Sequence, residues 1–183
     1  YEGREARVDV TGDSLDSLFD EYFGDRTEEE QAAIKRKYAN ARSILEAPQR
    51  MRRVCIDILK HYREHIQPNG FKAMIVTSSR YAAITYKEMM DELEAPESAV
   101  IISGDHNDEQ RYWDYTDGTK HKTQIENFKK PIGSGDGQSN LSILIVKDML
   151  LTGFDAPIAQ VMYLDRKLTD HTLLQAIARV NRT

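Results

Sequence analysis

The sequence Leu-Ser-Ile-Leu-Ile-Val at residues 141–146 is followed directly by Lys147 and Asp148. A run this short, rich in isoleucine and valine, favours a strand that is buried on both faces. Similar runs lie at 71–77, 99–104 and 159–164, and helical patterns at 80–94 and 119–130 lie between the first three runs of the chain. Short apolar runs that alternate with helices predict an α/β fold built on a parallel sheet.

The first 67 residues have a different character and are predicted to be mostly helical. Thr27 and Glu30 form a capping-box pattern, which opens a helix that runs to about residue 47. Pro48 opens another helix, whose apolar stripe continues to about Ile66. The sequence Pro-Asn-Gly at 68–70 then breaks the pattern. We therefore expect a helical extension at 1–67 and an α/β domain at 68–183.

The composition is that of an ordinary globular protein, with 40% hydrophobic and 30% charged residues. There is no apolar run of the roughly 18 residues that a membrane helix needs, and no signal-peptide pattern. The single cysteine, Cys55, excludes an internal disulfide framework. These features together predict a cytoplasmic protein with no membrane partner.

The charge is spread unevenly along the chain, although the formal net charge is only −5. Residues 1–30 contain eleven acids and three bases, whereas residues 35–65 contain nine bases and three acids. The net charge argues against attraction of the whole surface to DNA. The basic segment is either a solvated helix face or a face that follows phosphates.

Polar residues follow the first and third apolar runs, where the carboxyl ends of parallel strands collect ligands. Hydroxyls, backbone amides and cations at such ends suit the phosphates of DNA. The candidates are Thr77, Ser78, Ser79, Arg80 and Lys147. Ser79 is equally suited to cap the helix that follows it, and the two roles are compatible.

The last stretch of the chain, at 175–182, predicts a helix on which Gln175, Arg179 and Arg182 share one face. Two guanidinium groups on one face suit a polyphosphate, because each keeps its charge and offers a fork of donors. Two arginines at this spacing are also common on solvated surfaces. The spacing alone leaves both interpretations open.

Together, residues 147–157 and 175–182 resemble motifs V and VI of the superfamily 2 helicases and translocases, in the same order. A narrower resemblance is to the R subunit of type I restriction–modification enzymes. It is carried by residues 1–4, 72–80, 146–157 and 175–183, and residues 72–80 resemble the motif IV strand. The resemblance implies a RecA-like parallel sheet flanked by helices, the second of two motor lobes.

The resemblance also implies roles for single residues. Arg179 would be the arginine finger on the γ-phosphate of ATP held by the other lobe, and Arg182 would also serve the nucleotide. Gln175, Gly153 and Asp155 would be nucleotide-binding. The DNA-binding residues would be Thr77, Ser78, Ser79, Arg80, Lys147 and Thr152. Two departures from the pattern are Ala178, where the family usually has glycine, and Lys147, where many relatives have threonine.

The implied cofactors are ATP and Mg²⁺, and the chain has no phosphate-cradling loop and no Asp-Glu-x-His box of its own. We therefore expect the first RecA-like lobe to hold them. The implied partners are double-stranded DNA, the first lobe and the nuclease domain of the same subunit, and the methyltransferase and specificity subunits. We expect a fragment of an ATP-dependent DNA translocase, inactive alone and truncated after motif VI. The alternatives are a lobe of another superfamily 2 helicase acting on DNA or RNA, and a non-catalytic RecA-like binding module.

Two further patterns carry less weight. The sequence His-Tyr-Arg-Glu-His at 61–65 matches an inverted zinc-protease pattern, but it lies in a basic helix that disfavours a cation, so we predict no metal site. Tyr112, Trp113 and Tyr115 have the character of base-stacking residues. Their polar neighbours instead favour an insertion loop that packs its own aromatic side chains.

Overall fold

The computed structural model describes residues 27, 29–31, 46–150 and 154–165. Contacts divide the chain into two compact units, Tyr1–Asp57 and Ile58–Thr183. In the first unit, the Thr27 amide donates to Glu30 Oε2 (3.1 Å) and the Glu30 amide donates to Thr27 Oγ1 (3.3 Å). The predicted capping box is therefore confirmed.

Helix α4, Pro48–His61, begins at the predicted proline and continues across the division between the units. It passes into a π-helical turn, η1 (Tyr62–Ile66), and a 3₁₀ turn, η2 (Gln67–Asn69). Gly70 then adopts a φ of 75° and its amide donates to Gln67 O (2.9 Å). A glycine takes this left-handed conformation at little steric cost, so the helical stretch ends where the sequence predicted a break.

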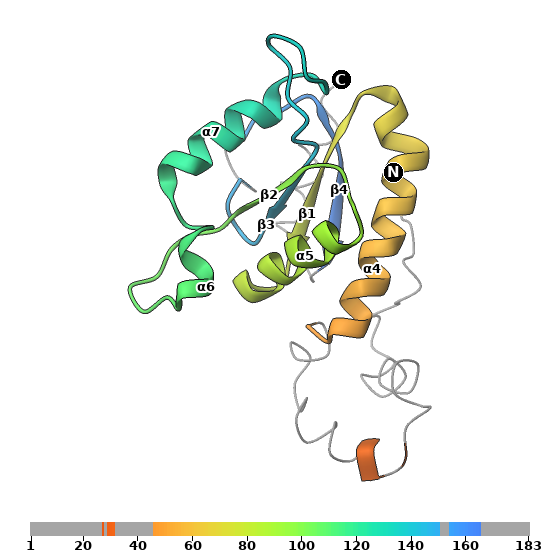
Figure 1. The fold of residues 1–183 in the computed structure, drawn as a ribbon, viewed down its shortest axis with the longest axis vertical. Helices are drawn as coiled ribbons and strands as arrows, with labels where there is room; N and C mark the ends of the chain where they lie inside the picture. The colour runs from red at the N-terminus through yellow and green to blue at the C-terminus, as the bar shows by residue number, and fades with distance from the viewer. Residues whose placement is uncertain (1–26, 28, 32–45, 151–153, 166–183) are drawn as a thin grey trace. The chain divides into compact units, whose positions relative to one another are not determined.

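The second unit is built on a four-stranded sheet in which every observed pairing is parallel (Figure 1). The strands are β1 (Lys72–Thr77), β2 (Ser98–Ile101), β3 (Ile143–Val146) and β4 (Ala159–Asp165), in the spatial order β2-β3-β1-β4. The helices between them are α5 (Arg80–Glu92), α6 (Gln110–Trp113) and α7 (Gly118–Lys129). The predicted α/β fold, a parallel sheet flanked by helices, is confirmed. The short helix α6 was not predicted.

The position of each strand in the sheet agrees with its burial. All six residues of the central strand β1 are buried, whereas β4, at one end of the strand order, is only partly covered. Alternate residues of β1, β2 and β3 form one apolar cluster, in which the fully buried ring of Phe128 from α7 is included. This cluster fixes α7 against the sheet.

A charged residue, Lys72, lies in the central strand β1. Lys72 is fully buried, and its Nζ donates to Asn127 O (3.2 Å) and Ser139 O (3.3 Å) and lies 5.6 Å from the centre of the Phe128 ring. Burial lowers the pKa of Lys72 to about 8, against the opposing effect of Glu97. Because Asn127 lies in the last turn of α7, the ammonium meets the negative end of that helix.

Candidate functional site

The carboxyl ends of β1 and β3 form a topological switch point. Going from β1 to β2 the chain crosses the sheet past β3, and going from β3 to β4 it crosses past β1 in the opposite direction. Segments that leave two adjacent parallel strands in opposite directions open a crevice between the strand ends, which is where ligands bind in open α/β sheets. The register pairs Val76 with Val146, so Thr77 and Lys147 are the next positions at this edge.

Thr77 joins the two strand ends. Its buried Oγ1 lies 2.9 Å from Ser79 O and 3.2 Å from Val146 O, and its single proton serves both acceptors. The hydroxyl of Thr77 therefore links the carboxyl ends of β1 and β3. Its predicted contact with DNA stays a prediction.

Ser79 caps α5, because its Oγ accepts from the Ala82 amide (3.0 Å) and its backbone is extended. The predicted cap is confirmed. Its neighbour Ser78 differs, since Ser78 Oγ is buried and has no hydrogen-bond partner among the described residues. A buried hydroxyl in this state marks a place where an acceptor or donor is still missing.

Arg80, the first residue of α5, is held by the segment that follows β2. Its Nη2 donates to Asp108 Oδ1, and its guanidinium carbon lies 4.6 Å from the centre of the Tyr112 ring. The hydrogen bond from Arg80, with one from the Asp105 amide (2.7 Å), lowers the pKa of Asp108. Arg80 Nε is buried without a partner in the described part of the chain.

A second arginine mirrors the first. Arg111 of α6 lies 4.8 Å from the centre of the Tyr81 ring and donates to Glu88 Oε2 (2.7 Å) and Thr85 Oγ1 (3.2 Å) of α5. Arg80 of α5 thus contacts Tyr112 of α6, and the next residue of α5, Tyr81, contacts Arg111 of α6. We call these two the crossed arginine–tyrosine contacts. We call residues 105–113 the brace. The sequence gives no sign of these contacts, because the pairs lie far apart along the chain.

The aromatic residues of the brace region agree in part with the prediction of an insertion that packs its own rings. Tyr112 packs on Arg80, and Trp113 Nε1 donates to Asp108 O (3.1 Å) within the loop. Trp113 is nevertheless 63% exposed. Its hydrogen-bonding group is satisfied, but its ring is not packed away.

At the end of the neighbouring strand, Lys147 follows β3 and pairs with its neighbour Asp148 (2.8 Å), and the two side chains are 40% and 55% exposed. Leu150 follows with a φ of 65°, a left-handed conformation that is rare for a leucine, and its side chain packs against the apolar cluster. Asp155 is exposed. The positive φ lies within the stretch that resembles motif V.

The end of β4 is fixed by a buried pair that the sequence did not reveal. Tyr86 of α5 donates to Asp165 Oδ2 over 2.6 Å, and both residues are buried. Asp165 pairs in register with Thr77, so it lies at the same edge of the sheet. The remaining predicted site residues, Thr152, Gly153, Gln175, Arg179 and Arg182, lie outside the described residues.

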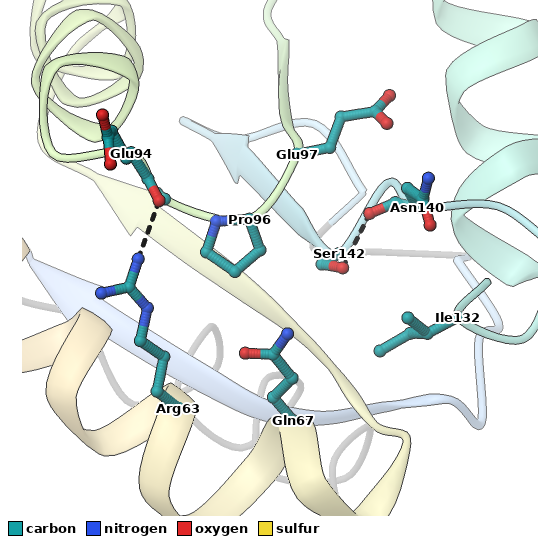
Figure 2. A pocket seen from close by; sticks show the side chains of 9 residues that line it. Arg63, Gln67, Glu94, Pro96, Glu97, Ile132, Asn140 and Ser142 are labelled. Atoms are coloured by element: carbon teal, nitrogen blue, oxygen red, sulfur yellow. Dashed lines mark hydrogen bonds between the residues drawn. The ribbon is translucent and has the colours of Figure 1, made fainter. Parts of the chain in front are cut away.

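A hollow of about 340 Å³ lies where β2 and β3 begin, at the opposite end of the strands (Figure 2). Glu97 and Ser142, which line it, directly precede β2 and β3, and Arg63 Nη2 donates there to Glu94 O (2.7 Å). The Arg63 guanidinium is therefore held by a backbone carbonyl. The hollow lies at the amino ends of β2 and β3, away from the switch point.

The histidine pattern at 61–65 has an ordinary role in the described structure. His61 Nδ1 lies 2.7 Å from the Tyr163 hydroxyl, and the rings of His61 and His65 are 5.1 Å apart. Among the described residues, no three histidine, cysteine or acidic side chains gather as metal ligands would. In the same residues, no helix has both the length and the apolar character to cross a bilayer.

Comparison with known proteins gives consistent matches. A family model described as type I restriction enzyme subunit R domain 3 matches residues 104–183. A protein of Methanocaldococcus jannaschii named "Putative type I restriction enzyme MjaIXP endonuclease subunit" is 35% identical over 186 residues, which cover 100% of this chain and 17% of that protein. The type I restriction enzyme HindI endonuclease subunit of Haemophilus influenzae is 29% identical over 91% of this chain and 16% of its own length. The chain thus spans less than a fifth of these relatives.

Proposed function

Because this chain belongs to the family of type I restriction enzyme R subunits, we propose that it supplies the second RecA-like lobe of an ATP-driven DNA translocase. In this role it contributes part of the DNA track and one side of the ATP site. The relatives are named as endonuclease subunits and are far longer than this chain. The nuclease and the rest of the motor therefore belong to other parts of the intact subunit.

The observation that carries the proposal is the switch point between β1 and β3. It brings the segment 77–80 and Lys147 to the same end of the sheet, although nearly seventy residues separate them along the chain. The donors at this edge are hydroxyls, amides and cations. Such a set suits phosphate oxygens, which accept hydrogen bonds and carry negative charge.

Three features support binding of a DNA phosphate here. Helix α5 begins three residues after β1 ends, so the positive end of its dipole lies at this end of the sheet. Ser78 Oγ is a hydroxyl with no partner among the described residues. The Lys147 side chain is 40% exposed, so its ammonium is accessible to a phosphate, which would compete with Asp148 for it.

The nucleotide side of the proposal involves residues that follow β3 and β4. Arg179 would place its guanidinium on the γ-phosphate, where negative charge develops during transfer, and Arg182 and Gln175 would hold the same nucleotide. Gly153 and Asp155 would couple the nucleotide to the DNA, with Thr152 on a DNA phosphate. ATP and Mg²⁺ would be held mainly by the first lobe, because this sequence has no phosphate-cradling loop and no Asp-Glu-x-His box.

The proposed partners follow from the same assignment. They are double-stranded DNA, the first lobe and nuclease domain of the same subunit, and the methyltransferase and specificity subunits of the restriction enzyme. By itself the chain would hydrolyse no ATP. A non-catalytic RecA-like module is the alternative, which the following experiment separates from a motor.

The test uses the intact R subunit with Lys147→Ala, and Lys122→Ala as a control because Lys122 is exposed on α7. DNA-stimulated ATP hydrolysis is measured against DNA concentration and salt. Lys147→Ala is expected to raise the DNA concentration for half-maximal stimulation and to lower the slope of log affinity against log salt by about 0.9, the value for one lost phosphate contact. An unchanged DNA dependence would refute the DNA role of this edge, and a lack of any stimulation in the unmodified subunit would favour the non-catalytic module.

A further inference from the structure

The brace is tied to α5 by the two crossed arginine–tyrosine contacts. Helix α6 has only four residues, which is too short to be stable alone, so its place depends on these contacts. Arg80 with Tyr112 forms one contact, and Arg111 with Tyr81 forms the other. The two are not equivalent, because Arg80 follows the carboxyl end of β1, whereas Arg111 belongs to α6 and donates to Thr85 and Glu88 of α5.

The Arg80 guanidinium is fixed in three ways. Asp108 accepts from Nη2, the Tyr112 ring covers one face, and only 19% of the Arg80 side chain is exposed. Asp108 is itself fixed, since its Oδ2 accepts from the Asp105 amide and its carbonyl accepts from Trp113 Nε1. A flexible arginine loses much conformational freedom when it binds a phosphate, whereas this one has lost it already.

The guanidinium still has donors to offer. Asp108 uses only Nη2 of the five N–H groups, and Nε has no acceptor among the described residues. Ser78 Oγ, two residues earlier at the same strand end, also has none. Two buried polar atoms close to one strand end thus lack partners among the described residues, which points to an acceptor that completes this site.

We propose that Asp108 and Tyr112 are positioning residues, which hold the Arg80 guanidinium ready for a single DNA phosphate at the carboxyl end of β1. The inference rests on the proposed DNA role of this edge. It assigns a function to the brace, which orders an arginine before DNA arrives. Removing the Asp108 carboxylate makes the protein less negative, yet by this proposal it weakens DNA binding.

The test measures binding of a labelled linear duplex by the intact R subunit over a series of salt concentrations. The variants are Arg80→Ala, Asp108→Asn, Tyr112→Leu and the double variant Arg80→Ala with Asp108→Asn. Glu88→Gln is the matched control, because it removes the carboxylate that Arg111 contacts and changes the net charge by the same amount. Circular dichroism and a thermal melt of each variant show whether it is folded.

Arg80→Ala is expected to weaken binding and to lower the salt slope by about 0.9. Asp108→Asn and Tyr112→Leu should each weaken binding about two- to tenfold, the cost of ordering one long side chain. Glu88→Gln should leave the affinity unchanged, and Asp108→Asn should have no further effect when Arg80 is already absent.

Four results would overturn the proposal. Tighter binding by Asp108→Asn would show that Asp108 only competes with DNA for Arg80. Equal losses with and without Arg80, or equal losses for Asp108→Asn and Glu88→Gln, would show that the brace acts only on the fold. Normal binding by Arg80→Ala would remove Arg80 from the DNA contact, while a loss of binding in Lys147→Ala would still support the proposed function.

Discussion

Replacement of Lys72 by methionine tests the core of the fold, because it removes a charge that the structure buries completely. Burial lowers the Lys72 pKa from 10.5 to about 8. Between these two pH values the unfolded chain holds a proton that the folded chain has released. The free energy of unfolding therefore rises with pH over this range on account of Lys72.

The size of the effect follows from the pKa shift. A change of one pKa unit corresponds to about 1.4 kcal/mol, so the shift of Lys72 corresponds to about 3 kcal/mol. The wild-type chain should gain this amount relative to Lys72→Met as the pH is raised from about 7 to about 11. Other groups that titrate in this range are shared by both proteins, so they cancel in the difference.

The measurement is urea denaturation followed by circular dichroism at several pH values, on the wild-type chain, Lys72→Met and the control Lys122→Met. Lys122 is exposed on the same helix that Lys72 contacts, so its replacement should leave the difference flat across the pH range. A flat difference for Lys72→Met as well would refute the burial of the ammonium. A difference of the opposite sign would mean that Lys72 is stabilised as a cation.

Five further replacements test three features of the fold by denaturation. Phe128→Ala should cost about 3–5 kcal/mol because the ring is fully buried, and Phe128→Leu should cost less. Ser79→Ala should lower the free energy of unfolding by about 1 kcal/mol, because the cap on α5 is lost. Ser78→Ala should lower it little, because Ser78 Oγ makes no hydrogen bond among the described residues. Equal losses for the two variants would contradict the capping role of Ser79. Tyr86→Phe removes one donor from the buried Asp165 carboxylate and should cost about 1–3 kcal/mol, and a neutral result would contradict the importance of that bond.

Among the described residues, the sequence predicted the strands and longer helices to within a few residues, because each buried strand is a short apolar run and each long helix has an apolar stripe. The prediction failed at α6, where four residues in a polar stretch adopt a helix. That helix is held in place by the hydrogen bonds from Arg80 to Asp108 and from Arg111 to Glu88. The two residues of each pair are more than twenty positions apart along the chain. A local pattern carries no information on such contacts.

The candidate site was predictable as a set of residues, but not in its geometry. The strand-end rule selected the segment 77–80 and Lys147. It did not show that the Thr77 hydroxyl joins two strands, or that Arg80 is held by Asp108. The strand order makes β1 and β3 neighbours and so places the segment 77–80 close to Lys147. That order depends on how the connecting segments cross the sheet, which a local pattern does not reveal.

In the function proposed above, this lobe completes an ATP site whose phosphates are held by another lobe. Single-turnover hydrolysis of ATP by the intact R subunit, with saturating DNA, tests it most directly when Arg179 is replaced by alanine. The claim predicts a fall in rate of about 10³- to 10⁵-fold with DNA binding retained, as for loss of an arginine finger. An unchanged rate would contradict the claim.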